Sequence, residues 1–183
     1  MAITTEQIPA GTWTLDPTHS EISFSVRHLA ISKVKGTFER FDASLTTAED
    51  HTASAVTATI DVASINTNQK DRDGHLQTGD FFLTSEHPTM TFTSKSIEEK
   101  KGEQFLVHGD LTLRGVTKPV TLDAEFGGLV VDGYGQTKLG FSATTKIDRT
   151  AFGVNWNAAL EAGGFTLGND VTVSLEIQFT LAQ

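Results

Sequence analysis

The sequence predicts an all-β protein, built as an antiparallel sandwich or barrel, on two observations. Apolar and polar residues alternate along several segments, which is the period-two pattern of half-buried strands. Gly- or Pro-marked turns separate these segments, and they favour antiparallel strands over βαβ units. The 183 residues contain no linker. We therefore expect a single domain over residues 1–183, of which 1–11 form a flexible N-terminal segment.

The strands are predicted in chain order from their apolar faces. The first follows a turn at Asp16 and places Ile22, Phe24 and Val26 on one face. Over residues 38–41 the apolar phase slips by three positions, which a β-bulge or a sharp bend in a long strand would explain. Further alternating runs predict strands at residues 56–62, 105–113, 116–126, 139–147 and 171–181.

One segment near residues 69–83 interrupts the strand pattern and predicts a short helix. Asn68 is a candidate cap for it, and Gly74 should shorten or bend it. Arg72 and His75 are three positions apart, so on a helix they would share one strip of surface.

A second interruption, near residues 150–162, predicts another short helical segment. It carries the aromatic pair Phe152 and Trp156, and three glycines follow before the last strand. We expect this segment to form a packed cap or flap over one end of the sheet.

Composition excludes several classes of function. The net charge is -9, from 14 Lys plus Arg against 23 Asp plus Glu, and this charge repels nucleic acid and anionic lipid surfaces. With no cysteine, disulfides, thiolate zinc sites and Cys nucleophiles are ruled out. The first eleven residues do not resemble a signal peptide, and no stretch approaches the roughly 18 apolar residues of a membrane-spanning helix. We expect a soluble cytoplasmic protein, or a periplasmic or secreted one if a signal peptide has been removed.

The polar residues offer weak enzyme and metal alternatives. Asp16, His19 and Ser20 supply the residue types of a hydrolytic triad, but His19 and Ser20 are adjacent and no GxSxG elbow accompanies them. A DPTHS turn more readily uses these side chains in local backbone hydrogen bonds. Six histidines are present, but none has close metal-ligand spacing, and His28 lies roughly 30 Å from His19 along an extended strand. We therefore expect no catalytic residues, no metal and no cofactor.

The aromatic residues suit either a filled core or an apolar tunnel. Twelve Phe accompany one Tyr and two Trp, so most rings carry no hydrogen-bonding group, as a tunnel for a hydrocarbon would require. Phe-rich strands also form ordinary cores, and composition alone favours that interpretation.

Several motifs together resemble one protein family. They are DPTHSEISFSVRH, VKGTFERFDASL, INTNQKDRDGHLQTGDFF with HPTMTFTS, GDLTLRGVTKPVTL, and IDRTAFGVNW with LGNDVTVSLEIQF. In this order, from about Trp13 to Phe179, they resemble the YceI-like family of polyisoprenoid-binding proteins. The resemblance implies a lipocalin-like antiparallel β-barrel of about eight strands, a size whose interior is filled by side chains or holds one slender ligand.

The resemblance also implies a function. It favours the tunnel over the filled core, and with it the non-catalytic binding, sequestration or transport of an amphiphile with a long isoprenoid or alkyl tail, such as a quinone or a polyprenyl phosphate. The alternatives are a filled-barrel structural or stress-related interaction protein and, less readily, a hydrolase. We expect no nucleic-acid partner, at most transient membrane contact, and a monomer or homodimer. The predicted tunnel residues are Ile22, Phe24, Val26, Phe38, Phe81, Phe92, Leu111, Phe141, Phe152, Trp156, Val173 and Leu175.

The candidates for holding the ligand's head group are the cationic and imidazole side chains at the strand ends and interruptions. Each can donate a hydrogen bond to a phosphate or quinone oxygen, and arginine can clamp a phosphate with two bonds. A structural alternative stays open, in which these groups pair with Asp73, Asp80 or Asp148 and fasten loops to the barrel. The candidates are Arg27, His28, Arg72, His75 and Arg149.

Overall fold

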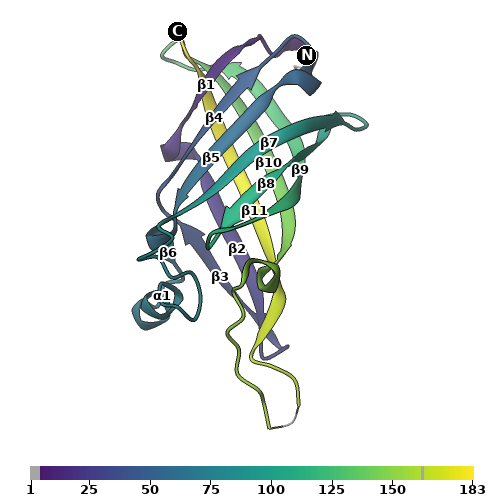
Figure 1. Ribbon diagram of the computed structural model, residues 1–183. Coiled ribbons are helices and arrows are strands. Elements are labelled where there is room, and N and C mark those ends of the chain that lie inside the picture. The colour runs from purple at the N-terminus through teal and green to yellow at the C-terminus, as the bar shows by residue number, and fades with distance from the viewer. Residues whose placement is uncertain (1–4, 162) are drawn as a thin grey trace.

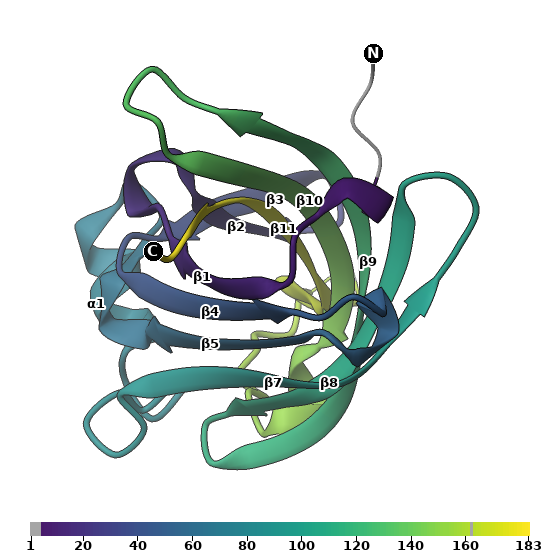
Figure 2. The ribbon, with the colours of Figure 1, turned by 90° about the horizontal axis from the view of Figure 1, so that it is seen from above.

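A computed structural model describes residues 5–161 and 163–183 of the chain, and it confirms the antiparallel β-barrel (Figures 1 and 2). The sheet runs in the order β1-β4-β5-β7-β8-β9-β10-β11-β2-β3-β6, and an additional pairing of β1 with β11 closes eight of these strands into a ring. All the pairings are antiparallel. The strands are β1 (Gly11–Leu15), β2 (Glu21–His28), β3 (Ser32–Phe38), β4 (Phe41–Thr47), β5 (Ala55–Asp61), β6 (Ile65–Asn66), β7 (Thr89–Glu99), β8 (Gln104–Leu113), β9 (Val116–Val131), β10 (Thr137–Asp148) and β11 (Leu167–Leu181).

Two places in the ring are occupied by pairs of strands that lie end to end. β1 and β2 both pair with β11, β1 near its C-terminal end and β2 along its N-terminal half. Next to them, β4 pairs with β1 and β3 pairs with β2. β3 ends at Phe38 and β4 begins at Phe41, so the predicted break in the apolar phase is a bend between two strands. At the bend, Ser64 Oγ accepts a hydrogen bond of 2.9 Å from the Arg40 amide.

The first predicted helix is present and short. α1 spans Lys70–Leu76, and its cap is Gln69, whose side chain accepts a hydrogen bond from the Arg72 amide. Asn68, the expected cap, instead adopts a left-handed backbone with φ of 61°.

The second helical segment is limited to a four-residue 3-10 turn at Arg149–Phe152. Gly153 ends this turn in the left-handed conformation, with φ of 80°. The carbonyls of Val154 and Trp156 then accept hydrogen bonds from the Arg149 side chain, and the chain after Gly153 runs as a loop. The predicted helix at 150–162 is therefore limited to its first residues, and residue 162 lies outside the described residues.

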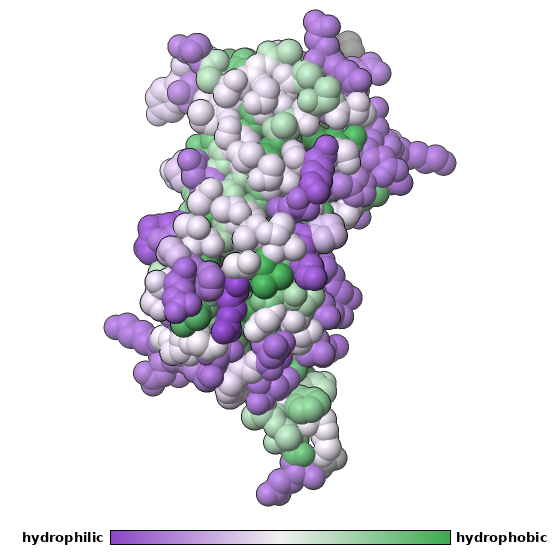
Figure 3. Space-filling view, viewed as in Figure 1, coloured by the Kyte–Doolittle hydropathy of each residue, from purple (hydrophilic) through white to green (hydrophobic). Residues whose placement is uncertain are grey.

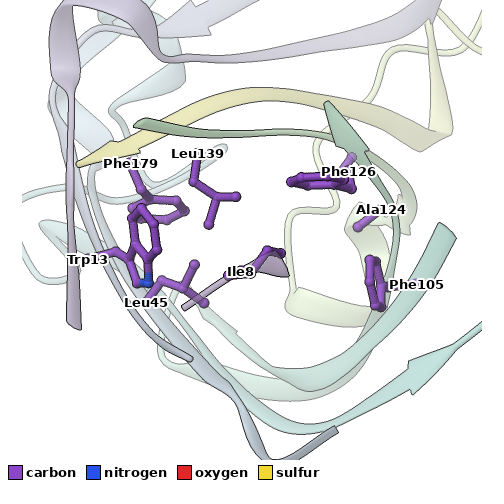
Figure 4. Close-up of a cluster of buried hydrophobic side chains, with 9 residues drawn as sticks. Ile8, Trp13, Leu45, Phe105, Ala124, Phe126, Leu139 and Phe179 are labelled. Atoms are coloured by element: carbon purple, nitrogen blue, oxygen red, sulfur yellow. The ribbon is translucent and has the colours of Figure 1, made fainter. Parts of the chain in front are cut away.

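One end of the barrel, the upper end in Figure 1, is closed by packed side chains (Figure 4). Trp13 is fully buried, and its indole Nε1 donates a 2.8 Å hydrogen bond to Thr47 Oγ1. Thr47 Oγ1 in turn donates to the Pro9 carbonyl at 2.7 Å. Ile8 belongs to the same cluster, so part of the segment expected to be flexible packs on the barrel; residues 1–4 of that segment lie outside the described residues.

Two strand glycines allow phenylalanine rings to lie flat against the wall. A β-carbon on Gly36 would stand 2.5 Å from the Phe24 ring, and one on Gly109 would stand 2.6 Å from the Phe92 ring. Neither site has room for a side chain, so these glycines determine how the rings line the interior.

We expect Gly109→Ala to destabilise the barrel by about 1 to 3 kcal/mol, the usual cost of overpacking. The added carbon would lie 2.5 Å from the backbone oxygen of Thr93, which cannot move without breaking the sheet. Gly140→Ala is the matched control, because a β-carbon there meets nothing within 4 Å. Chemical denaturation of both variants tests this, and equal stability of the two would contradict the packing described here.

Candidate functional site

The interior of the barrel is hollow and contains two adjoining cavities. The upper one has a volume of about 230 Å³, and the lower one about 310 Å³. Five side chains line both cavities and form a waist between them: Phe24, Phe38, Met90, Ile147 and Val173. At this waist the rings of Phe24 and Phe38 lie 5.6 Å apart between centroids.

The upper cavity is apolar over nearly its whole wall. Every second residue of several strands faces this cavity, and these residues include Ala58, Leu122 and Leu175. Its few polar neighbours include Thr47 and His51, which belong to β4 and to the turn that follows it. A space with such a wall favours a hydrocarbon over water.

The lower cavity has a mixed wall and lies at the end of the barrel that α1 and the loop before β11 cover (Figure 1). Four of the five predicted head-group candidates line it: His28, Arg72, His75 and Arg149. These residues come from β2, α1 and the 3-10 turn after β10, so segments far apart in the sequence meet here.

Arg27 does not belong to this wall. Its side chain is exposed on the outer face of β2, because it alternates with Val26 and His28, which line the cavity. Its placement among the candidates is therefore corrected, and the alternation itself could have predicted the difference.

The predicted tunnel residues lie in the walls with one exception. Ile22, Phe24, Val26, Phe38, Phe81, Phe92, Leu111, Phe141, Trp156, Val173 and Leu175 line one or both cavities. Phe152 lines neither, and its expected place in the tunnel is corrected. The 3-10 turn carries it into a cluster with Phe92, Leu111 and Leu113, where it is 2% exposed.

Arg149 is a buried cation that pairs with no carboxylate among the described residues. Its side chain is 5% exposed, its Nε donates to the Gly168 carbonyl at 2.9 Å, and its Nη1 donates to the carbonyls of Val154 and Trp156. Within the described residues, its Nη2 is buried with no hydrogen-bond partner. Burial lowers the pKa of Arg149 from its ordinary value, although the nearby Asp148 charge opposes this. Asp148, the partner that the structural alternative offered, makes no direct ion pair with Arg149 in the described residues.

Arg72 is held by Thr67 and not by an acid. Its Nε donates to Thr67 Oγ1 at 2.7 Å and its Nη2 to the Thr67 carbonyl at 2.8 Å. Asp73 accepts from the Thr67 amide, and Asp80 pairs with His75. The guanidinium therefore lines the cavity with no ion pair in residues 5–161 and 163–183.

An aromatic cluster joins α1 to the loop before β11. The His75 ring lies 5.0 Å from Phe81 and 5.1 Å from Trp156, both edge-on, and His75 Nε2 lies 2.8 Å from Asp80 Oδ2. Arg114 adds a support that the sequence analysis missed, because its Nη1 donates to the carbonyls of Gly79 and Phe81. From the sequence, Arg114 is marked only by the glycine that follows it.

The residues of the candidate triad are used in local structure. Asp16 Oδ1 accepts from the Thr18 amide at 3.1 Å, and Asp16 Oδ2 lies 2.9 Å from His19 Nδ1 and 3.1 Å from Lys138 Nζ. Ser20 Oγ accepts from the Gln178 amide. The hydrogen bond with His19 first, and then Lys138, holds the pKa of Asp16 below its ordinary value. This geometry agrees with the predicted capping role and offers no nucleophile–base pair.

Comparison with known proteins identifies the family. The model of the YceI-like domain matches residues 13–179. The chain belongs to the YceI-like family. A UPF0312 protein of Staphylococcus aureus (strain USA300) is 40% identical over 173 residues, which cover 93% of this chain and 98% of that protein.

Solved structures of the family share this barrel. The YceI protein of Campylobacter jejuni is 35% identical, with a TM-score of 0.72 over 86% of this chain and 90% of that one. Two more distant structures show the fold alone. BcnA of Burkholderia cenocepacia is 22% identical with a TM-score of 0.79, covering 90% of this chain and 98% of that one. A polyisoprenoid-binding domain of Saccharophagus degradans is 17% identical with a TM-score of 0.71, covering 95% and 100%.

Metal sites and membrane-spanning helices are both absent from the described residues. These residues contain no group of three or more His, Cys, Asp or Glu side chains that could hold a metal ion. None of their helices is long and apolar enough to cross a membrane.

We expect Arg149→Met to lower the free energy of unfolding by about 3 kcal/mol, because one buried and two partly buried hydrogen bonds to backbone carbonyls are lost. Arg40→Met is the matched control. Arg40 pairs with Asp61 at 2.9 Å on the surface, where it is 64% exposed, and such pairs contribute about 0 to 1 kcal/mol. Similar denaturation midpoints for the two variants would show that the Arg149 network does not hold the lower end.

The Asp16 network should make stability depend on pH. Since its pKa is lowered in the folded protein, its carboxylate stabilises the fold above the ordinary value of 3.8, and this contribution disappears as the pH falls through the lowered pKa. Asp16→Asn should therefore cost about 1 to 2 kcal/mol at neutral pH, and this cost should shrink in acid. Urea unfolding of the wild type and of Asp16→Asn across the acid range measures this cost. A cost that does not change with pH would contradict the stabilising role of the carboxylate.

Proposed function

We propose that the protein binds one amphiphile with a long isoprenoid or alkyl tail, holding the tail in the two cavities and the polar head at the lower one. The observation that carries this proposal is the division of the interior. The upper cavity is walled by apolar strand residues, whereas Arg72 and Arg149 line the lower one.

The apolar length of the interior suits a tail. Burying each methylene of a tail contributes about 0.8 kcal/mol before ordering costs, so a few isoprene units are sufficient for useful affinity. Passage from the lower to the upper cavity leads past Phe24, Phe38 and Met90, which would grip the tail along its length.

The polar groups of the lower cavity suit an anionic or oxygen-rich head. A buried guanidinium is costly unless its donors and its charge are satisfied. Arg149 has one unpartnered nitrogen and no carboxylate partner in the described chain, and Arg72 likewise makes no ion pair there. A phosphate or quinone oxygen would accept from such donors, so a polyprenyl phosphate or an isoprenoid quinone is the ligand class we favour.

We propose a non-catalytic role in sequestering or carrying this lipid. The Asp16, His19 and Ser20 side chains serve the turn before β2, and the groups around the lower cavity are arranged as hydrogen-bond donors. A domain of Saccharophagus degradans that shares the fold is described as polyisoprenoid-binding, which is consistent with this role.

Native mass spectrometry of protein purified from its own host tests the proposal. The expected result is an adduct of one lipid mass that organic extraction removes and that fragmentation assigns to a molecule with a long apolar tail. Protein free of any lipid, together with no binding of added polyprenyl phosphate or quinone, would reject it.

Reducing the upper cavity should shorten the tail that binds best. Ala58 lines this cavity, and Ala58→Leu should displace about three methylenes of a long tail, a loss of roughly 2 kcal/mol in binding. Short tails confined to the lower cavity should bind as before, and the fold should keep its stability.

Ala55→Leu is the control for this variant, because Ala55 lies on the same strand and is exposed. Isothermal titration with polyprenyl phosphates of increasing length separates the two variants. If Ala58→Leu loses stability while affinity for every tail stays unchanged, the space around Ala58 is a filled core.

A further inference from the structure

The lower end of the molecule exposes large apolar side chains at its tip. Ile31 is 80% exposed, Phe165 is 63% exposed, and Leu29 is 36% exposed. They belong to the β2–β3 hairpin and to the loop before β11, and the Leu29 amide joins these two segments by donating to the Thr166 carbonyl at 2.7 Å. Figure 3 shows apolar surface on the part of this end that projects from the barrel.

The hairpin turn has an unfavourable backbone for its sequence. Leu29 and Ala30 both have left-handed backbones, with φ of 53° and 58°, where Gly or Asn would be less strained. Leucine at such a position gives up local stability, and its side chain, 36% exposed, belongs to none of the buried clusters of the described residues. Its side chain therefore suits a contact outside the chain.

The strands next to the turn carry unpaired positive charge. Arg27, Lys33 and Lys35 are exposed, and Arg27 lies directly opposite Lys33 in the β2–β3 register. Like charges in opposite positions destabilise a sheet. No ion pair with these three residues is found within the described parts of the chain, so an anionic surface outside the protein would complement them.

The exposed tip is continuous with the wall of the lower cavity. His28 precedes Leu29 and lines that cavity, as do Thr166 and Leu167, which follow Phe165. A surface that contacts the tip therefore lies beside the lower cavity.

We propose that this tip, made of Leu29, Ile31 and Phe165 with Arg27, Lys33 and Lys35, docks on the surface of an anionic lipid bilayer. The apolar side chains enter the headgroup region, and the cations meet lipid phosphates. The net charge of -9 opposes this contact only weakly, because charges farther away than about 8 Å are screened at physiological salt. The docking is thus transient, and it places the lower cavity against the bilayer.

A second exposed apolar hairpin provides the internal control. At the opposite end, the β9–β10 hairpin exposes Val130, Val131 and Tyr134, which are 58%, 67% and 93% exposed. It carries Asp132 at its turn, and Lys138 on β10 is paired with Asp16. This hairpin has comparable apolar exposure, and Lys138 beside it is paired.

Vesicle flotation with the full chain tests the proposal. The vesicles are phosphatidylcholine alone or phosphatidylcholine with phosphatidylglycerol, and neither contains an isoprenoid. The wild type should float with the anionic vesicles and much less with the neutral ones. Ile31→Asp should abolish flotation, Lys33→Gln should weaken binding about fivefold, and Val131→Asp should behave as the wild type. Glu161 is an exposed acid in the loop that carries Phe165. Its negative charge opposes contact with an anionic bilayer, so Glu161→Gln should strengthen binding.

Three results would overturn the docking surface. They are no flotation of the wild type with anionic vesicles, equal loss in Val131→Asp and Ile31→Asp, and a wild-type dimer that Ile31→Asp dissociates in light scattering without any vesicle binding. The last result would make the tip a surface between two copies of the chain. Because the vesicles lack isoprenoid, each of these failures leaves lipid binding in the cavities to be judged by mass spectrometry alone.

Discussion

The closure of the sheet by β11 is the constraint on which the rest of the structure depends. This strand pairs with β10 along its length and, on its other side, with β1 and β2 in succession. Closure removes the free edges of the ring and forces every second residue of each barrel strand to face the lumen. Apolar residues at those positions are therefore sufficient to make the interior apolar.

Whether such an interior is hollow depends on how its largest side chains are arranged. Phe24 lies against Gly36, and Phe92 lies against Gly109, so these rings follow the wall. The two cavities that remain adjoin at Phe24 and Phe38. The lower end is stabilised differently, by arginine side chains that donate hydrogen bonds to backbone carbonyls. Arg149 fixes the loop before β11, and Arg114 fixes the chain after α1. Arg149 thus combines a structural role with a charge at the cavity wall.

Period-two alternation reports directly which residues face inward, and it predicted most of the strands. It did not predict β1 or β7. The same rule explains why Val26 and His28 line the lower cavity while Arg27 is exposed. It fails at Phe152, which lies in a 3-10 turn where alternation has no meaning. It also could not predict the extended loop after Gly153, because that conformation depends on hydrogen bonds to Arg149. Composition could not predict that the interior is hollow, because the same phenylalanines could fill a core. Only the family resemblance favoured a tunnel.

The central claim is that one continuous lipid tail occupies both cavities with its polar end at the lower one. A high-resolution crystal structure of protein purified without delipidation tests it most directly. The account predicts elongated density that passes between Phe24 and Met90 and ends within hydrogen-bond distance of Arg72 or Arg149. Ordered water in both cavities, or side chains that close the waist and fill the lumen, would contradict it.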